Sequence, residues 1–114
     1  MIGGRIYDAP PRKAISPYLV IGRHEIRPLG GTPSAGAGEA QEIVLTLSIL
    51  SQAEGLAEAR DTAAATRNAL HNARLTLDGW RLVQMRVVFV DVYRGADGRT
   101  CLGLVRLRAA VEPQ

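Results

Sequence analysis

The segment RLVQMRVVFVDVYRGADGRTCLGLVRLRAAVE, residues 81–112, decides the fold. Two long runs rich in β-branched residues, 81–95 and 99–112, flank Ala96-Asp97-Gly98, and this arrangement predicts a β-hairpin. A three-residue loop with Gly98 in the left-handed region places Gly95 opposite Arg99. That position fixes the pairing of every residue further along the two strands.

This register brings apolar side chains together on one face of the hairpin. The pairs are Val83 with Val111, Met85 with Ala109, Val87 with Leu107 and Phe89 with Val105. A shift by one residue would pair apolar side chains with charged ones, so we expect this face to belong to the core. The register also places Arg86 opposite Arg108 on the outer face, where like charges are unfavourable unless an acidic group lies near.

Towards the hairpin tip the pattern inverts, and apolar side chains fall on the outer face. They are Val88, Val90, Val92, Leu102 and Leu104. One helix of a small domain does not cover both faces of the tip, so we expect an exposed apolar surface that contacts another molecule. Together with Arg86, Arg106 and Arg108, these residues form the predicted subunit or partner interface. The alternative is that residues 5–29 fold over this face.

The sequence before the hairpin predicts two more strands and a helix. EIVLTLSIL (42–50) alternates with a period of two, and residues 17–29 read as another strand. Ser51 and Glu54 fit a capping box, which starts an amphipathic helix at about 52–73. Its apolar stripe consists of Leu56, Ala59, Ala63, Thr66, Leu70 and Ala73. The prediction is one α+β domain over residues 1–114, an antiparallel sheet in the order β-β-α-β-β with the helix packed on one face.

The glycine-rich stretch PLGGTPSAGAGEA (28–40) does not fit a phosphate-binding loop. Such a loop ends in a lysine and a hydroxyl residue and leads into a helix, whereas this stretch is followed by Glu42 and a strand. Because it is too long for a tight hairpin, we expect a flexible docking loop between two strands. Its residues are Gly30, Gly31, Thr32, Pro33, Ser34, Gly36 and Gly38.

The polar residues predict no catalytic set, cofactor site or metal site. Cys101 falls within a strand, where a cysteine usually serves as a small apolar side chain. His24 and His71 have no second ligand at metal spacing. Asp91, inside a strand, could act as a base, but an ion pair between subunits or a solvated position explains it equally well. We therefore expect a protein that is not an enzyme.

Composition and charge favour a protein without a membrane segment or a strong nucleic-acid site. No apolar run approaches the ~20 residues of a membrane helix, and the N-terminus lacks the apolar stretch of a secretory signal. The single cysteine fits a reducing compartment, which points to assembly in the cytoplasm. The net charge of +3 is far below that of a nucleic-acid-binding stripe, although the excess lies within residues 80–114.

The order of these features resembles the tail-completion, or tail terminator, proteins of long-tailed bacteriophages and gene-transfer particles. The similarity covers nearly the whole chain. The segments that carry it are GGRIYDAPPR (3–12), SPYLVIG (16–22), EIVLTLSILS (42–51), GLAEARDTAAATRNAL (55–70), LDGWRLVQMRV (77–87) and GLVRLRAAVE (103–112). The family usually has a helix before the first of these segments, whereas this sequence begins with that segment.

The resemblance implies a virion structural protein that forms a ring, commonly a hexamer, at the head-proximal end of the tail tube. Such a ring ends tube growth and docks to the head-tail connector or stopper protein, and DNA passes through its lumen without specific binding. The partners would be other copies of this chain, the tube protein and the connector. An alternative is a small oligomeric α+β module that binds nucleic acid or a small ligand, and a third reading is an enzyme with a site completed between subunits.

Overall fold

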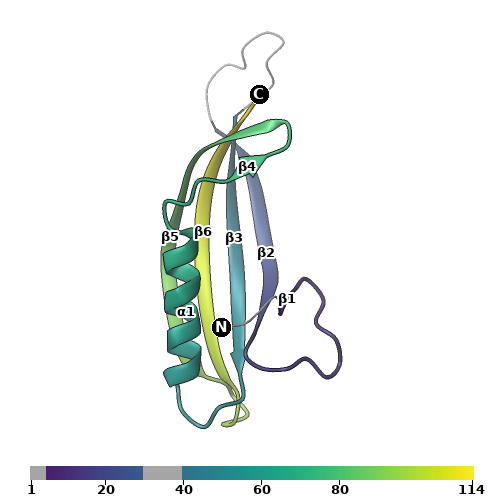
Figure 1. The fold of residues 1–114 in the computed structure, drawn as a ribbon, viewed down its shortest axis with the longest axis vertical. Coiled ribbons are helices and arrows are strands. Elements are labelled where there is room, and N and C mark those ends of the chain that lie inside the picture. The colour runs from purple at the N-terminus through teal and green to yellow at the C-terminus, as the bar shows by residue number, and fades with distance from the viewer. Residues whose placement is uncertain (1–4, 30–39) are drawn as a thin grey trace.

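The computed structural model describes residues 5–29 and 40–114, which form an elongated body of 55 × 23 × 22 Å (Figure 1). A curled sheet runs along the whole body, and a single helix lies against one face of it. The elements are β1 (Ile6–Tyr7), β2 (Tyr18–Pro28), β3 (Gln41–Ser51), α1 (Ala57–Leu70), β4 (Thr76–Leu77), β5 (Trp80–Arg94) and β6 (Cys101–Pro113).

The six strands lie in the order β1-β2-β3-β6-β5-β4, so the two central strands, β3 and β6, come from different parts of the chain. The four long strands pair with one another in antiparallel orientation, as predicted. The expectation of a purely antiparallel sheet of four strands was wrong, because β1 pairs in parallel with β2 and the short β4 pairs with β5. The fold is α+β, with a mixed sheet and one helix.

The core lies between α1 and the odd-numbered residues of β3 and β6. Leu47 and Ile49 of β3 and Val105 and Leu107 of β6 are at most 5% exposed. Gly103 leaves room for the side chain of Ile49, because a Cβ atom there would lie 3.2 Å from the Cβ and 3.3 Å from the Cδ1 of Ile49. The period of two predicted for 42–50 therefore identifies the core face of β3 correctly.

The helix buries part of the predicted stripe, and it begins later and ends earlier than the predicted 52–73. Ala59 and Ala63 are buried, whereas the capping box was wrong because Ser51 is the buried last residue of β3. The Ser51 hydroxyl donates to Glu58 Oε1 at 2.7 Å and accepts the amide hydrogen of Ala53 at 3.2 Å. The serine thus ties the end of the strand to the first turn of the helix.

The predicted hairpin register holds only in the middle of β5 and β6. Met85 pairs with Ala109, and Arg86 lies opposite Arg108, as expected. Irregularities between Leu82 and Gln84 and between Val87 and Phe89 shift the register on both sides of this segment. The predicted partners Val83–Val111 and Phe89–Val105 were therefore wrong, since Leu82 pairs with Val111 and Val90 with Val105.

The irregularity at Val88 also corrects the predicted inversion of faces at the tip. One extra residue in β5 restores the apolar side chains that follow to the core face, which is what a β-bulge does. Val90 lies opposite the buried Val105, and Val92 packs against the core. Only Leu102 and Leu104 keep the predicted place on the outer face, opposite Tyr93 and Asp91.

Asp97 stabilises the hairpin turn through its carboxylate. Oδ1 accepts the amide hydrogens of Arg99 and Thr100, each at 2.9 Å, and Oδ2 accepts the Thr100 hydroxyl at 2.7 Å. Gly98 has the predicted left-handed conformation, with a φ of 72°. The hydrogen bonds from Thr100, followed by that from the Arg99 amide, lower the pKa of Asp97 from its ordinary 3.8 to about 2.

We expect this lowered pKa to make the turn sensitive to acid. A carboxylate with a depressed pKa in the folded protein stabilises the fold above its ordinary pKa, and that stabilisation is lost as the pH falls from about 4 towards 2. Asp97→Asn keeps an acceptor oxygen but cannot titrate. The melting temperature of the variant should therefore decrease less steeply than that of the wild type between pH 5 and pH 2. Parallel curves for the two proteins would contradict this role.

Candidate interaction surfaces

Arginine side chains are concentrated on the face of the sheet opposite α1, which is called here the open face. This group of arginines is called the arginine field. Arg106 and Arg108 of β6, together with Arg23 and Arg27 of β2, line a shallow depression of about 320 Å³. Glu25, Val44 and Thr46 complete its lining. Arg86 of β5 lies beside this depression, directly opposite Arg108.

Two glutamates neutralise part of the arginine field. Glu25 lies between Arg23 and Arg27, with N···O distances of 3.3 and 3.0 Å. The hydrogen bond from Arg27 and the charge of Arg23 lower the pKa of Glu25 below its ordinary 4.5. Glu42 lies 3.8 Å from Arg108, a weak contact.

Among residues 5–29 and 40–114, neither Arg86 nor Arg106 forms a salt bridge, although the charge of Arg106 contributes to lowering the pKa of Glu25. The Arg106 guanidinium lies 5.5 Å from the centre of the Phe89 ring and donates to the Thr46 hydroxyl at 3.5 Å. The three predicted interface arginines, Arg86, Arg106 and Arg108, are thus neighbours on one exposed surface with incomplete neutralisation.

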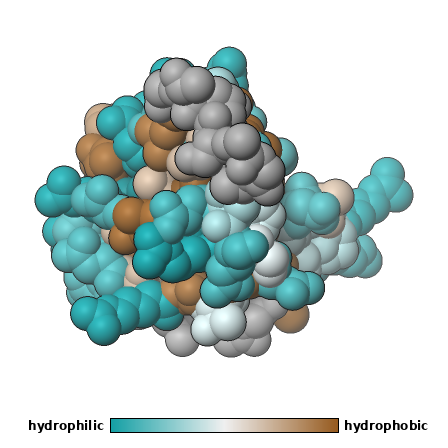
Figure 2. Space-filling view, turned by 90° about the horizontal axis from the view of Figure 1, so that it is seen from above, coloured by the Kyte–Doolittle hydropathy of each residue, from teal (hydrophilic) through white to brown (hydrophobic). Residues whose placement is uncertain are grey.

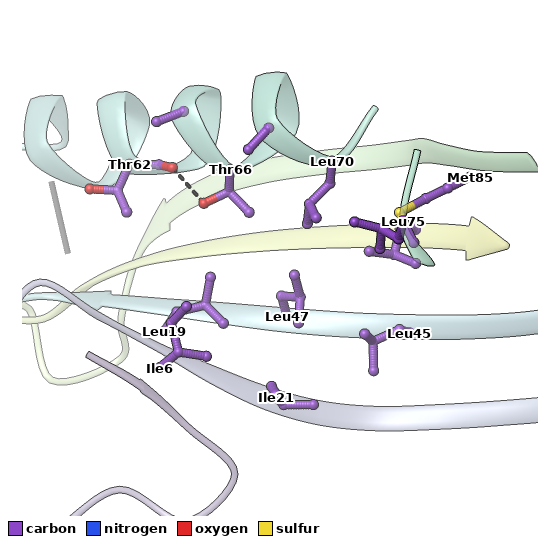
Figure 3. A pocket seen from close by; sticks show the side chains of 13 residues that line it. Ile6, Leu19, Ile21, Leu45, Leu47, Thr62, Thr66, Leu70, Leu75 and Met85 are labelled. Carbon is purple, nitrogen blue, oxygen red and sulfur yellow. Dashed lines mark hydrogen bonds between the residues drawn. The ribbon is translucent and has the colours of Figure 1, made fainter. Parts of the chain in front are cut away.

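The opposite face of the sheet contains an apolar groove that sequence reasoning missed. It has a volume of about 500 Å³ and lies beside α1, above β2 and β3 (Figure 3). Ile21, Leu45 and Leu47 point up from the strands, and Leu70 points down from the helix. The other lining residues are Ile6, Leu19, Thr62, Ala65, Thr66, Ala69, Leu75, Met85 and Leu107.

The groove exists because the sheet is wider than α1. A helix is about 10 Å across, and neighbouring strands lie about 4.8 Å apart, so one helix covers about two strands. α1 packs on β5, β6 and the near side of β3, which leaves the side of β1 and β2 uncovered. The sequence contained an indication of this groove. Leu19 and Ile21 alternate in the same way as the apolar residues of 42–50, and their strand, β2, is the neighbour of β3 in the sheet.

A second apolar surface lies at the other side of the sheet, on β5, and is called here the tip edge. Its exposed apolar side chains come from both faces of the strand: Phe89 and Tyr93 lie on the open face, opposite Arg106 and Leu102, and Val90 lies on the face of the core, opposite Val105. With Val88, these residues are 40–48% exposed. Among the described residues, β4 pairs only with the beginning of β5. Further along the strand, the Asn72 amide donates a hydrogen bond to the Met85 carbonyl, and the Val87 amide donates to Nδ1 of His71. No described strand pairs with the tip edge from outside, so it is open to a partner.

The predicted interface residues therefore occupy three places rather than one. Val88 and Val90 lie in the tip edge, Val92 is half-buried against the core, and the arginines lie on the open face. Leu102 and Leu104 are half-buried on the open face near the hairpin tip. The alternative, that residues 5–29 fold over this face, was wrong, because β2 extends the sheet instead.

The remaining predicted features are placed as follows. Gly30–Gly38 of the docking loop lie outside the described residues; at the ends of that segment, Leu29 donates to the Ala40 carbonyl at 2.8 Å. Cys101 is fully buried. Within the described ranges, no three His, Cys, Asp or Glu side chains gather in a way that could hold a metal ion. No helix in those ranges is long and apolar enough to cross a membrane.

The segment that joins β1 to β2 extends sideways from the body (Figure 1) and is mainly hydrophilic. Seen from above, the molecule shows hydrophobic side chains in separate patches among hydrophilic ones (Figure 2). Ile15, in this segment, is 67% exposed. The groove and the tip edge lie on different sides of the sheet.

Comparison with known proteins gives consistent results. The family model described as tail completion protein gp17 matches residues 1–112. A chain of the solved structure described as the virion of a native gene transfer agent (GTA) particle is similar with a TM-score of 0.82 and 25% sequence identity, over 97% of this chain and 81% of that chain. A search among curated proteins finds no match.

Proposed function

We propose, because this chain belongs to the tail completion protein gp17 family, that it forms a ring at the head-proximal end of a phage-like tail. The chain is a structural protein of a phage-like particle. In our proposal the ring, a hexamer, ends growth of the tail tube and joins it to the head-tail connector or stopper protein. DNA passes through its lumen.

The observation that carries the ring proposal is the presence of two different apolar surfaces on opposite sides of one subunit. A ring is built from heterologous contacts, in which one patch of a subunit meets a different patch of the next. The groove above β2 and β3 is concave, and the tip edge on β5 is an exposed apolar strand. Contact between the tip edge of one copy and the groove of the next covers both surfaces.

The runner-up is a binding module, because the groove volume of about 500 Å³ lies in the range of small-molecule sites. Such sites orient their ligands through a few polar groups. The described lining contains only two, the hydroxyls of Thr62 and Thr66, and both donate to helix carbonyls at 2.8 Å. A lining of this kind favours apolar side chains of another protein over a specific small ligand.

We test the proposal by mixing the purified chain with its tail tube protein. Native mass spectrometry should show a closed oligomer, and electron microscopy should show tubes of limited length that end in an added ring. The control is tube protein alone, which should continue to elongate. A chain that stays monomeric in the mixture, with tubes growing unchanged, would refute the ring function; uptake of small apolar probes by that monomer would favour the binding module.

A further inference from the structure

We propose that the arginine field of the open face contacts the phosphate backbone of duplex DNA. The proposal rests on the proposed ring, through which DNA passes, and it adds which face of the subunit meets the DNA. The residues are Arg86, Arg106 and Arg108, with Arg23 and Arg27 beside them.

The first argument is the arrangement of like charges. Arg86 lies directly opposite Arg108 in neighbouring strands, a position in which two cations destabilise a sheet unless an anion lies near. Glu42 approaches Arg108 only to 3.8 Å, Glu25 acts on Arg106 through its charge without a salt bridge, and Arg86 forms no salt bridge with a described residue. The surface is thus complementary to an external anion.

The second argument is geometry. Arg106 and Arg108 are two residues apart on β6, so their side chains leave the same face about 7 Å apart, and Arg86 lies one strand away at about 5 Å. Arg106 and Arg108 share a depression of about 320 Å³ with Arg23 and Arg27. Guanidinium groups bind phosphate oxygens through paired hydrogen bonds, so neighbouring phosphates of one strand can be bound together.

The composition of the surface favours DNA over an acidic protein. The central part of a protein–protein interface is apolar and poor in charge, whereas Val44 is the only apolar residue that lines this depression. Contacts to phosphates are electrostatic and carry no sequence information. Glu25 and Glu42 reduce the net charge of the field, which limits affinity and allows DNA to slide past.

The experiment measures binding of a fluorescent DNA duplex by the assembled protein at increasing salt concentration. The test variant is Arg86→Gln, Arg106→Gln and Arg108→Gln together. The control is Arg60→Gln, Arg67→Gln and Arg74→Gln, which removes the same charge from exposed positions on and after α1. Each lost phosphate contact lowers the magnitude of the slope of log K against log salt by about 0.9. We therefore expect this magnitude to decrease by about 2–3 in the open-face variant and by less than about 1 in the control.

Three outcomes would overturn the proposal. The first is an equal loss of slope in the open-face and control variants, and the second is unchanged DNA binding by the open-face variant. The third is an open-face variant that binds DNA normally but no longer forms a ring, which would mean that the arginines contact an acidic protein. Ring formation by each variant is measured separately by native mass spectrometry. Failure of the wild-type chain to form a ring refutes the proposed function, whereas a ring that keeps its DNA binding without these arginines refutes only this inference.

Folding of the open-face variant is checked by thermal unfolding. Because the substitutions remove the repulsion between Arg86 and Arg108, we expect a melting temperature no lower than that of the wild type. A lower melting temperature together with normal DNA binding would show that the arginines stabilise the sheet, and would also contradict the proposal.

Discussion

Val88→Asp combined with Val90→Asp is expected to abolish ring assembly while leaving the monomer folded. The two side chains are 48% and 40% exposed in the isolated chain, so aspartate remains hydrated there and costs the monomer little. In an apolar contact the same carboxylates would be desolvated without partners, which is strongly unfavourable. Size-exclusion chromatography and native mass spectrometry of the variant with tube protein should show monomers only.

The matched control for this prediction is Val83→Asp, since Val83 belongs to the same strand, is 56% exposed and lies outside the tip edge. It should assemble like the wild type. Circular dichroism distinguishes the possible failures: an unfolded double variant would mean that Val88 and Val90 belong to the core. A folded double variant that still forms rings would remove the tip edge from the subunit contact.

Ile49→Ala is expected to produce the largest loss of stability from a single side chain. Ile49 is fully buried in the central strand β3 and packs against Gly103 of β6. Truncating a buried isoleucine to alanine costs about 2–5 kcal/mol, because the neighbours relax only partly into the cavity. That is a large share of the about 5–15 kcal/mol that holds a typical domain folded.

Urea unfolding followed by circular dichroism measures this loss as a lower midpoint at unchanged slope. Ile26→Ala is the control, because Ile26 lies in neighbouring β2 but is 59% exposed. It should shift the midpoint far less. Equal shifts of the midpoint in the two variants would mean that the packing of Ile49 against the helix and β6 does not make a dominant contribution to the free energy of unfolding.

The strands could be predicted from sequence where a single physical pattern determines them. The alternation in 42–50 identifies Leu47 and Ile49 as core residues because a strand directs successive side chains to opposite faces. Gly98 identifies the hairpin turn because glycine adopts a positive φ without steric cost. Both predictions were confirmed by the positions of these residues.

The register and the start of the helix depend on tertiary structure and could not be predicted in this way. The irregularity at Val88 allows Val90 and Val92 to reach the core face, a gain that no local pattern of β5 reveals. Ser51 and Glu54 match a capping box in spacing, yet pairing of Ser51 with Cys101 keeps the serine in the sheet. Tertiary hydrogen bonding outweighed a local preference in that case.

For the same reason, only some of the candidate surfaces could be predicted from the sequence. The opposed pair of Arg86 and Arg108 followed from the two-strand pattern alone, whereas Val90 is exposed although the outer face predicted for it was wrong. The groove requires the order of all strands, since it depends on β2 lying on the far side of β3 from the helix. That order cannot be read from any one segment of the sequence.

The length of the body has a consequence for the particle. β5 and β6 have 15 and 13 residues and run together along a molecule 55 Å long, so the axis is braced by hydrogen bonds over most of its extent. If the long axis lies along the tail in the proposed ring, the length of this sheet sets the distance between the tube and the connector. Adding two residues to each long strand would lengthen the subunit by about 7 Å, and in that arrangement the altered ring would no longer fit between a tube and a connector of unchanged dimensions.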